Sequence, residues 1–399
     1  RLPYLRSYPH GMVAVVRNPH VLANRLCRMD KPPQTLESRE MSKFTRRDLM
    51  KAVAAASALP LLGQSASAAD PLKVGFIFLG PIGDYGWTWA HNKGRLELEK
   101  ALGDKVKTTY VENVKEDASA IPILRDLARQ GNKLIFATSF GYMDQVLEVA
   151  KEFPDVKFEH CTGFKRAPNV TTYNSRFHEG RAVTGTIAGH MSKSGVIGYL
   201  GSFKIPEVVM GVNAFTLAAQ AVNPKIQTKL VMIDSWFDPA KETAATQTLA
   251  NLGCDVIATH TDSPAPLQFC QQKGIFGFGQ GADMSKFAPK AHLTAIEDIW
   301  GPHYIARAKA MLDGSWKSED FWEGIKEGDV KISPYNAAVP KNVQEAADKV
   351  IDGYMKGTYD VFTGPIYDQN GAEKVAAGKK MALGDLATID WYVKGIQSA

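Results

Sequence analysis

The segment Gly80–Trp89, GPIGDYGWTW, combines residue types that suit the capture of a flat ligand. Its glycines let the backbone approach a ligand closely. Asp84 can accept hydrogen bonds from ring or amino N–H groups, or it can cap the helix that follows. Tyr85 and Trp87 offer flat faces for stacking, with core packing as the competing role for Trp87. A phosphate-binding loop would need a Lys-Ser/Thr pair, which this segment lacks.

Motifs typical of hydrolases are missing, since no G-x-S-x-G elbow, H-E-x-x-H helix or S-x-x-K motif occurs. Carboxylates are frequent in any globular chain, so Asp84 with Asp283 does not make a catalytic pair without geometry. His91, His178 and His260 are scattered, which is more typical of surface or capping residues than of metal ligands. The sequence favours a binding protein with no catalytic residue, metal or cofactor, and a hydrolase is the weaker alternative.

The distribution of charge argues against nucleic acid as a partner. The whole chain has 47 Lys and Arg against 42 Asp and Glu, a net charge of +5. Residues 1–69 contain 11 of the basic and 4 of the acidic residues, so residues 70–399 contain 36 and 38, about −2. No basic excess remains there to bind phosphates. Within residues 70–399, the three cysteines Cys161, Cys254 and Cys270 are scattered, at most one disulfide can form among them, and no C-x-x-C spacing indicates a metal.

The segment 41–69 has the cationic start, the short apolar middle and the small residues at a cut that a secretory signal needs. Arg46 and Arg47 lie in TRRDLMK, which resembles the twin-arginine export motif. The apolar run is too short to span a bilayer as a permanent helix. An ordinary amphipathic helix with two arginines is the alternative interpretation.

Two expectations follow from this predicted signal peptide. Cleavage near Ala68 would leave a periplasmic protein, and because no Cys stands at the cut we expect no lipid anchor. Residues 1–40 precede Met41, which resembles a natural initiator, and we expect them to be an upstream extension outside the fold.

From Leu72 onward, short apolar segments alternate with longer amphipathic ones. Strands are predicted at 73–79, 106–111, 133–138 and 156–160, and helices between them at 89–101, 118–130 and 141–153. This repeated βαβ order predicts a parallel sheet with helices on both faces.

A second series of the same kind begins with a predicted helix at 176–193. Strands are predicted at 195–200, 229–233, 255–259 and 275–278, and helices at 206–221, 239–252 and 264–273. Further helices at 303–312 and 343–354 are expected to return to the first lobe. The predicted fold class is therefore α/β, with two doubly wound lobes joined by a hinge. We expect residues 70–174 and about 300–399 in lobe 1, and residues 175–299 in lobe 2.

Two similar lobes in an exported protein are typical of a hinge-bending binding protein whose ligand lies between them. Ligands of parallel sheets bind beyond the carboxyl ends of the strands. Closure of the two lobes around the ligand is the usual motion of such proteins. We therefore expect the site in the loops that follow the strands.

Gly80–Trp89, together with Ser139–Tyr142, Gly195–Ser202 and Asp234–Lys241, resembles the basic membrane protein family of ABC-transporter substrate-binding proteins. The resemblance covers nearly all of Leu72–Ala399. It implies a type I periplasmic-binding-protein fold and a ligand that is a purine nucleoside or a related compound. It also implies delivery of that ligand, without chemistry on it, to an ABC permease in the inner membrane. We expect a monomer.

The resemblance assigns roles position by position. The family's first loop commonly reads Asp-x-Ser-Phe-Asn, so Asp84 matches its acid and Trp87 takes the place of its stacking Phe. Gly86 and Thr88 depart from the Ser and the Asn. Because these departures change the polar contacts, a free nucleobase, a modified purine and a nucleoside all stay open.

Three later aromatic residues are ligand-binding candidates on the same resemblance. Phe140 follows the third strand, where the family's loop approaches the ligand. Trp236 lies in a segment that matches the family well, and we expect it to oppose Trp87 so that the purine is sandwiched. Trp300 belongs to the predicted hinge and would close one side of the cleft. Core packing is the competing role for Phe140 and Trp300.

Family members also place ligand-facing polar residues at the ends of two strands of the second lobe. Asp262 and Asp283 stand at these places and are candidates for contacts to amino, ring N–H or hydroxyl groups. Turn capping is the competing role for both.

Another ligand class is compatible with the same fold. Sugar-binding and amino-acid-binding proteins share the two-lobe architecture, and sugar sites also use aromatic platforms with Asp and Asn. An amino-acid site would need Ser/Thr and backbone N–H groups for the carboxylate, a cluster that we do not identify. The family segments favour purines.

Overall fold

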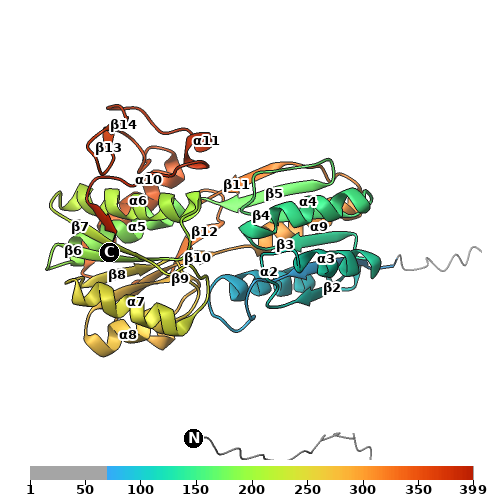
Figure 1. Cartoon of the computed structure of the whole chain (residues 1–399), viewed down its shortest axis with the longest axis horizontal. Coiled ribbons are helices and arrows are strands. Elements are labelled where there is room, and N and C mark those ends of the chain that lie inside the picture. The colour runs from blue at the N-terminus through green and yellow to red at the C-terminus, as the bar shows by residue number, and fades with distance from the viewer. Residues whose placement is uncertain (1–69, 399) are drawn as a thin grey trace, which may run out of the picture. The chain divides into compact units, whose positions relative to one another are not determined.

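The computed structural model of the chain describes residues 70–398, which form two lobes, each built on a mainly parallel β-sheet (Figure 1). The expected extension at 1–40 and the predicted signal at 41–69 lie outside the described residues. Among the described residues, no helix combines the length and the apolar character needed to cross a membrane.

Lobe 1 contains a six-stranded sheet in the order β11-β5-β4-β3-β1-β2, with all neighbouring strands parallel. Its strands are β1 (Leu72–Ile77), β2 (Val106–Val111), β3 (Leu134–Ala137), β4 (Lys157–Cys161), β5 (Val170–Ser175) and β11 (Asp320–Glu323). Its helices are α2 (Trp87–Leu102), α3 (Ala120–Arg129), α4 (Met143–Glu152) and α9 (Gly301–Asp313), with short 3₁₀ turns η1 (Gly103–Lys105) and η2 (Phe140–Tyr142).

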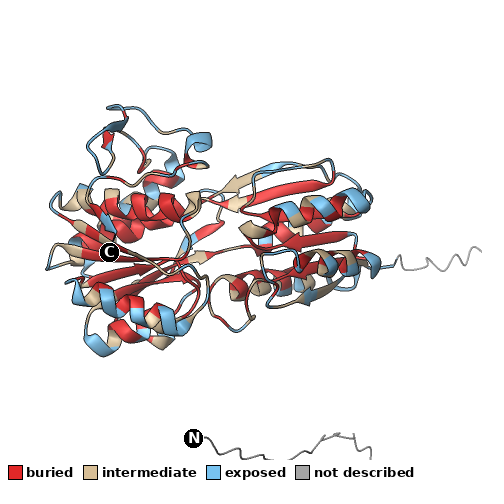
Figure 2. Cartoon of the chain, viewed as in Figure 1, coloured by how far each residue is buried: buried red, intermediate tan, exposed pale blue. Residues whose placement is uncertain are grey.

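The side chains of β1 and β3 alternate between two apolar layers of lobe 1. Phe76 and Phe136 pack with α2 and α9 on one face, whereas Ile77 and Ile135 pack with α3 and α4 on the other. A strand buried on both faces needs a continuous apolar sequence, which explains the run LIFA in β3. Figure 2 shows these central strands buried and the outer faces of the helices exposed.

Lobe 2 contains a seven-stranded sheet in the order β12-β10-β9-β8-β6-β7-β15, in which only the β10–β12 pair is antiparallel among the described strands. Its strands are β6 (Val196–Gly201), β7 (Gln227–Met232), β8 (Val256–Thr259), β9 (Phe276–Gly281), β10 (His292–Asp298), β12 (Val330–Ile332) and β15 (Ile396–Ser398). Its helices are α5 (Phe177–Met191), α6 (Pro206–Val222), α7 (Pro239–Asn251), α8 (Ala265–Lys273) and α10 (Lys341–Lys356), with the 3₁₀ turn η3 (Ser285–Phe287). This lobe confirms the predicted α/β class with doubly wound parallel sheets.

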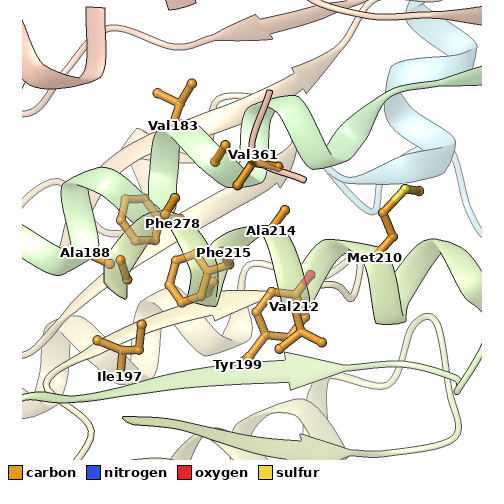
Figure 3. Packing of buried hydrophobic residues seen from close by; sticks show 14 of the residues in the cluster. Val183, Ala188, Ile197, Tyr199, Met210, Val212, Ala214, Phe215, Phe278 and Val361 are labelled. Carbon is orange, nitrogen blue, oxygen red and sulfur yellow. The ribbon is translucent and has the colours of Figure 1, made fainter. Parts of the chain in front are cut away.

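The largest apolar cluster lies where α5 and α6 pack on the sheet of lobe 2, with Val183, Phe215 and Phe278 among its buried members (Figure 3). The two helices approach closely because α5 carries glycine at the contact. A Cβ atom built on Gly185 would lie 2.3 Å from the carbonyl oxygen of Phe215, so a larger residue there would force the helices apart.

Three chain crossovers join the lobes, between β5 and α5, between β10 and α9, and between β11 and β12. Backbone hydrogen bonds tie them together: Arg176 N donates to Glu323 O (2.6 Å), and Ile299 N donates to Asp329 O (2.9 Å). The three crossovers therefore lie side by side and form one hinge.

The C-terminal part differs from the expectation that residues 300–399 belong to lobe 1. Helix α9 and strand β11 do lie in lobe 1, but β12, α10 and β15 belong to lobe 2. Val343 and Ala347 of α10 pack against α5 in the large cluster. The amphipathic pattern of α10 shows that one face is buried, but it does not specify which lobe covers that face.

Residues 363–398, which we call the C-terminal cap, follow Phe362 and lie beside α10 and α6 (Figure 1). The cap contains β13 (Ile366–Tyr367), β14 (Glu373–Val375), the short helix α11 (Leu383–Leu386) and β15. Strand β15 extends the sheet of lobe 2 by pairing with β7.

Candidate functional site

The side chain of Asp84 holds the loop between β1 and α2. Its Oδ1 accepts hydrogen bonds from the backbone N–H groups of Gly86 and Trp89 (both 2.9 Å), and Oδ2 accepts from that of Thr88 (3.0 Å). These N–H groups belong to the first turn of α2 and have no partner within the helix. Burial raises the pKa of Asp84 to about 6, against the lowering effect of these hydrogen bonds. In this structure Asp84 caps the helix and does not line the pocket described below.

Trp87 is the first residue of α2 and faces the space between the lobes. Its Nε1 donates to the carbonyl oxygen of Thr138, the residue that follows β3, over 2.6 Å. One side of the indole packs edge-on against His91 and Trp300, with ring centroids 4.6 Å and 5.5 Å away. The ring is therefore fixed on lobe 1, and it stays half-buried because its remaining surface lines a pocket.

Trp236 comes from lobe 2, in the loop between β7 and α7. Its Nε1 donates to Oε2 of Glu116, a lobe 1 residue, over 3.2 Å. Glu116 in turn accepts from Ser139 Oγ (2.5 Å) and from the backbone N–H of Gly141 (2.7 Å). The backbone oxygen of Trp236 accepts from the N–H of Asp262 (2.9 Å). Trp236 is thus bonded both to its own lobe and across the cleft.

Trp87 and Trp236 line the same pocket from opposite lobes, and we call it the inner pocket. Its cavity volume is only about 20 Å³, so the lining side chains nearly close it in this structure. Its lining residues are Leu79, Trp87, Ser139, Phe140, Thr162, Glu207, Trp236, His260, Asp262 and Gln280. Four of the predicted site residues therefore meet here, namely Trp87, Phe140, Trp236 and Asp262.

The polar wall of the inner pocket is acidic. Burial raises the pKa of Glu207 to about 7, and burial beside Asp84 raises the pKa of Asp262 well above its usual range. Glu207 Oε1 lies 3.2 Å from Nε2 of His260, whose burial lowers its pKa well below the ordinary value. Arg181, fully buried behind the wall, donates to Gln280 Oε1. None of the described residues that line the pocket is Lys or Arg, so the wall offers a ligand carboxyl groups and no cationic side chain.

Two predicted residues lie away from the inner pocket. Tyr85 packs against Phe287 of lobe 2 with ring centroids 4.9 Å apart, and Lys286 Nζ lies 3.6 Å from the centre of its ring. Asp283 is exposed and accepts from the backbone N–H of Ser285 (2.8 Å) at the start of η3. Tyr85 therefore contributes to the contact between the lobes, and Asp283 caps a turn.

Trp300 is also outside the inner pocket. It is 1% exposed and belongs to the apolar cluster of lobe 1, where it stacks on His91 with centroids 4.6 Å apart. Its contact with Trp87 makes it a support for that ring. In the structure, Trp300 therefore has the competing role of core packing.

Sequence reasoning missed Ser139, Thr162, Glu207 and Gln280 as pocket residues, and treated His260 as a surface or capping side chain. Ser139, Thr162 and His260 each stand within two residues after a strand of a parallel sheet. The rule that ligands bind beyond the carboxyl ends of strands was thus sufficient to find these three. Glu207 lies in the first turn of α6, where nothing in the sequence indicates that its side chain turns toward the cleft.

The described residues offer no metal centre. Within 70–398, no three His, Cys, Asp or Glu side chains converge in a way that could hold a metal ion. Cys161, Cys254 and Cys270 are buried and free.

Comparisons with known proteins agree with this architecture. A family model described as "ABC transporter substrate-binding protein PnrA-like" matches residues 72–362. A purine-binding protein of Brucella abortus is 52% identical over 336 residues, which are 84% of this chain and 96% of that protein. A protein of Haloferax volcanii whose name assigns it to glucose binding is 31% identical, over 77% of this chain and 78% of its own length.

A solved structure shows the same fold at low identity. The solute-binding protein of an ABC transporter from Aeropyrum pernix superposes with a TM-score of 0.64 at 15% identity, covering 79% of this chain and 97% of that one. Its identity is too low to say anything beyond the fold. The match over 72–362 and the 52% identical relative together show that this chain belongs to the Bmp family of PnrA-like ABC-transporter substrate-binding proteins, as its sequence segments predicted.

Proposed function

We propose that this protein is the periplasmic substrate-binding component of an ABC importer, and that it captures a purine base or nucleoside between its lobes. The observation that supports this most directly is the pairing of Trp87 and Trp236, one from each lobe, in a pocket with an acidic wall. The Brucella relative, which is 52% identical and is named a purine-binding protein, supports the same ligand class.

The two indoles provide the apolar part of recognition. A purine is flat and aromatic, and an offset-stacked or edge-to-face aromatic contact contributes about 0.5–1.5 kcal/mol beyond the area it buries. Nε1 of Trp87 is bonded to Thr138 O within lobe 1, so this ring is oriented before the ligand arrives, whereas the bond from Nε1 of Trp236 to Glu116 forms only when the lobes meet. A preoriented ring loses little conformational entropy on binding.

The carboxyl groups of Asp262 and Glu207 provide the polar part. Purine bases carry ring N–H and amino groups that donate, and ring nitrogens that accept; a protonated carboxyl group can accept from the former through its carbonyl oxygen and donate to the latter through its O–H. Phosphorylated ligands are disfavoured, because none of the described residues that line the pocket is a Lys or Arg that could pair with a phosphate. The proposed ligand is thus a base or nucleoside rather than a nucleotide.

Closure of the lobes provides the mechanism of capture. The ligand docks on one lobe in the open state, and contacts with the second lobe then favour the closed state through differential affinity. Contacts between the lobes, such as Trp236 with Glu116 and Tyr85 with Phe287, add to this preference. The closed form would present both lobes to the membrane permease, which releases the ligand for transport.

Export to the periplasm is part of the proposal and depends on the segment 41–69 with its Arg46-Arg47 pair. Expression of the full chain in a bacterium with and without a functional twin-arginine pathway tests it. We expect processed protein in the periplasmic fraction only when the pathway is intact, and Arg46→Lys combined with Arg47→Lys should prevent export. Export that persists in that variant would contradict the twin-arginine assignment.

A thermal-shift screen tests the ligand class. Because a ligand that binds only the folded state stabilises it, adenine, guanine, hypoxanthine and their nucleosides should raise the melting temperature in proportion to affinity. Glucose and other sugars belong in the same screen, because the Haloferax relative is named for glucose binding. A response to sugars or amino acids with none to any purine would overturn the proposal. Release of free base from a nucleoside would instead indicate a hydrolase.

A further inference from the structure

A second and larger cavity lies next to the inner pocket, and we call it the outer chamber. It shares Phe140, Thr162 and Glu207 with the inner pocket, so these three side chains form the junction between the two spaces. The cavity volume of the outer chamber is about 360 Å³. Its junction with the inner pocket means that a ligand filling the first can extend into the second.

Three parts of the chain form the wall of the outer chamber. Lobe 1 contributes residues that include Phe164 and Trp322, and lobe 2 contributes the start of α6 with Met210. The third part is α11 of the C-terminal cap, through Leu383, Gly384, Leu386 and Ala387. The family model ends at residue 362, so this third wall comes from a segment that lies beyond the family match.

The cap is fastened firmly to lobe 2. Asn213 of α6 donates through Nδ2 to Trp391 O (2.9 Å) and accepts from the N–H of Val393 (3.0 Å). Gln220 Nε2 donates to Lys394 O (3.0 Å). Leu386 is 2% exposed and belongs to the large cluster of lobe 2. Helix α11 therefore holds a fixed position relative to α6, as the wall of a binding site must.

The chemistry of the chamber suits an uncharged group that bears hydroxyls. Its apolar lining surrounds a few polar side chains, among them Thr162, Asn174, Glu207 and Asp320. None of the described residues that line it is Lys or Arg. Asp320 is bonded to Arg166 (3.1 Å) and Thr172 (2.8 Å), which leaves Glu207 as the acid that faces both spaces. A hydroxyl group can donate to or accept from such a carboxyl group, whereas a phosphate would find no Lys or Arg among the described lining residues to pair with.

We propose that the outer chamber is a second ligand subsite, which takes an uncharged, hydroxyl-bearing substituent of the purine such as the sugar of a nucleoside, and that α11 of the cap determines whether that substituent fits. This inference rests on the proposed purine-binding function, and it adds a role for a segment outside the family match. The base would occupy the inner pocket between the two indoles, and the substituent would pass the junction at Thr162 and Glu207.

Filling the chamber tests the inference. A Cβ atom on Gly384 would meet nothing within 4 Å, so Gly384→Trp can place an indole in the chamber without a clash at its own backbone. Ala372→Trp is the matched control, since it makes the same addition on an exposed site of the cap that lines neither cavity. Isothermal titration calorimetry with adenine, adenosine and AMP would measure each affinity in the parent and both variants.

We expect Gly384→Trp to weaken adenosine binding at least tenfold while adenine changes less than threefold, and Ala372→Trp to change neither. AMP should bind the parent much more weakly than adenosine. Equal affinities of the parent and Gly384→Trp for adenosine would overturn the inference, as would equal losses for adenine and adenosine. A parent that binds adenine but not adenosine would also overturn it and leave the proposed function intact. A parent that binds no purine would remove both.

Discussion

At the scale of single residues, the pairing of Trp87 and Trp236 in the inner pocket leads to a direct prediction. Replacing Trp236 by Ala removes one face of the inner pocket, and we expect purine affinity to fall about 10- to 100-fold, or about 1.4–2.8 kcal/mol. The melting temperature of the free protein should change little, because Trp236 is only half-buried and its indole bonds across the cleft. Calorimetry measures the affinity.

Phe237→Ala is the matched control for Trp236→Ala. Phe237 is the next residue, is 37% exposed and does not line the inner pocket. We expect the Phe237→Ala protein to bind like the parent. Parental affinity in the Trp236→Ala protein would refute the role of Trp236 in ligand binding.

The raised pKa of Glu207 leads us to expect that the stability of the protein depends on pH. Its pKa is raised by burial to about 7 from 4.5, so the folded state keeps the proton while the unfolded state has lost it. The free energy of unfolding should therefore fall as the pH rises from about 4.5 to 7, by about 3 kcal/mol from this group. In the Glu207→Gln protein this loss should be absent. Urea unfolding at pH 5 and pH 8 measures the difference.

An exposed acid provides the control for this comparison. Glu345→Gln changes a residue at the surface of α10 and should leave the pH dependence of the parent unchanged. If the Glu207→Gln protein loses as much stability as the parent between pH 5 and pH 8, Glu207 does not hold a proton in the folded state.

At the scale of elements, Asp84 connects the start of α2 to the position of Trp87. Asp84→Ala removes the acceptor for three backbone N–H groups, and we expect a loss of about 1–2 kcal/mol in the free energy of unfolding. Purine affinity should fall as well, because Trp87 lies in the turn that loses its cap.

Asp84→Asn separates capping from direct ligand contact. An Asn side chain keeps one oxygen to accept from the helix, so stability and purine affinity should both stay closer to the parent than in Asp84→Ala. A large loss of affinity in Asp84→Asn, with the melting temperature unchanged, would indicate that Asp84 contacts the ligand directly.

The same scale shows which elements the sequence predicts well. The apolar runs of β1, β3 and β8 and the amphipathic α3, α4 and α10 are evident, because burial on both faces or on one face leaves a clear pattern. Strands β5 (VTTYNS) and β10 (HLTAIED) were missed. Both contain buried polar side chains, such as Thr171 and Thr294, which donate to the distant carbonyl oxygens of Lys317 and Ser333, and a local pattern does not reveal such partners.

At the scale of the whole molecule, closure depends on a tight approach of the lobes at Gly86. A Cβ atom there would lie 2.4 Å from the backbone oxygen of Asp262, which belongs to the other lobe. We expect Gly86→Ala to hold the lobes apart and to weaken purine binding at least tenfold. Small-angle scattering should show that ligand reduces the radius of gyration of the parent but not of this variant.

Gly83→Ala is the control for the closure experiment. Gly83 lies in the same loop, is exposed, and a Cβ atom on it would meet nothing within 4 Å. This variant should close and bind like the parent. Compaction of the Gly86→Ala protein by ligand to the same extent as the parent would contradict the proposed importance of this approach.

Taken by itself, the sequence determined the α/β class, the two-lobe plan and the family. It also pointed to Trp87 and Trp236 as two aromatic residues that line the inner pocket. These follow from local patterns and from segments that carry a family's features regardless of their neighbours. The predicted signal at 41–69 is also a property of sequence, since it is recognised before folding.

Only the tertiary structure decided how the remaining residues are used. Asp84 caps a helix, Trp300 packs in a core and Asp283 caps a turn, whereas Glu207 reaches the pocket. The same structure places α10 and the C-terminal cap on lobe 2 and brings α11 to the outer chamber. The physical reason is that a carboxylate or an indole serves equally well as cap, core or ligand contact. Which role it takes depends on neighbours that lie far away in the chain and meet only in the fold.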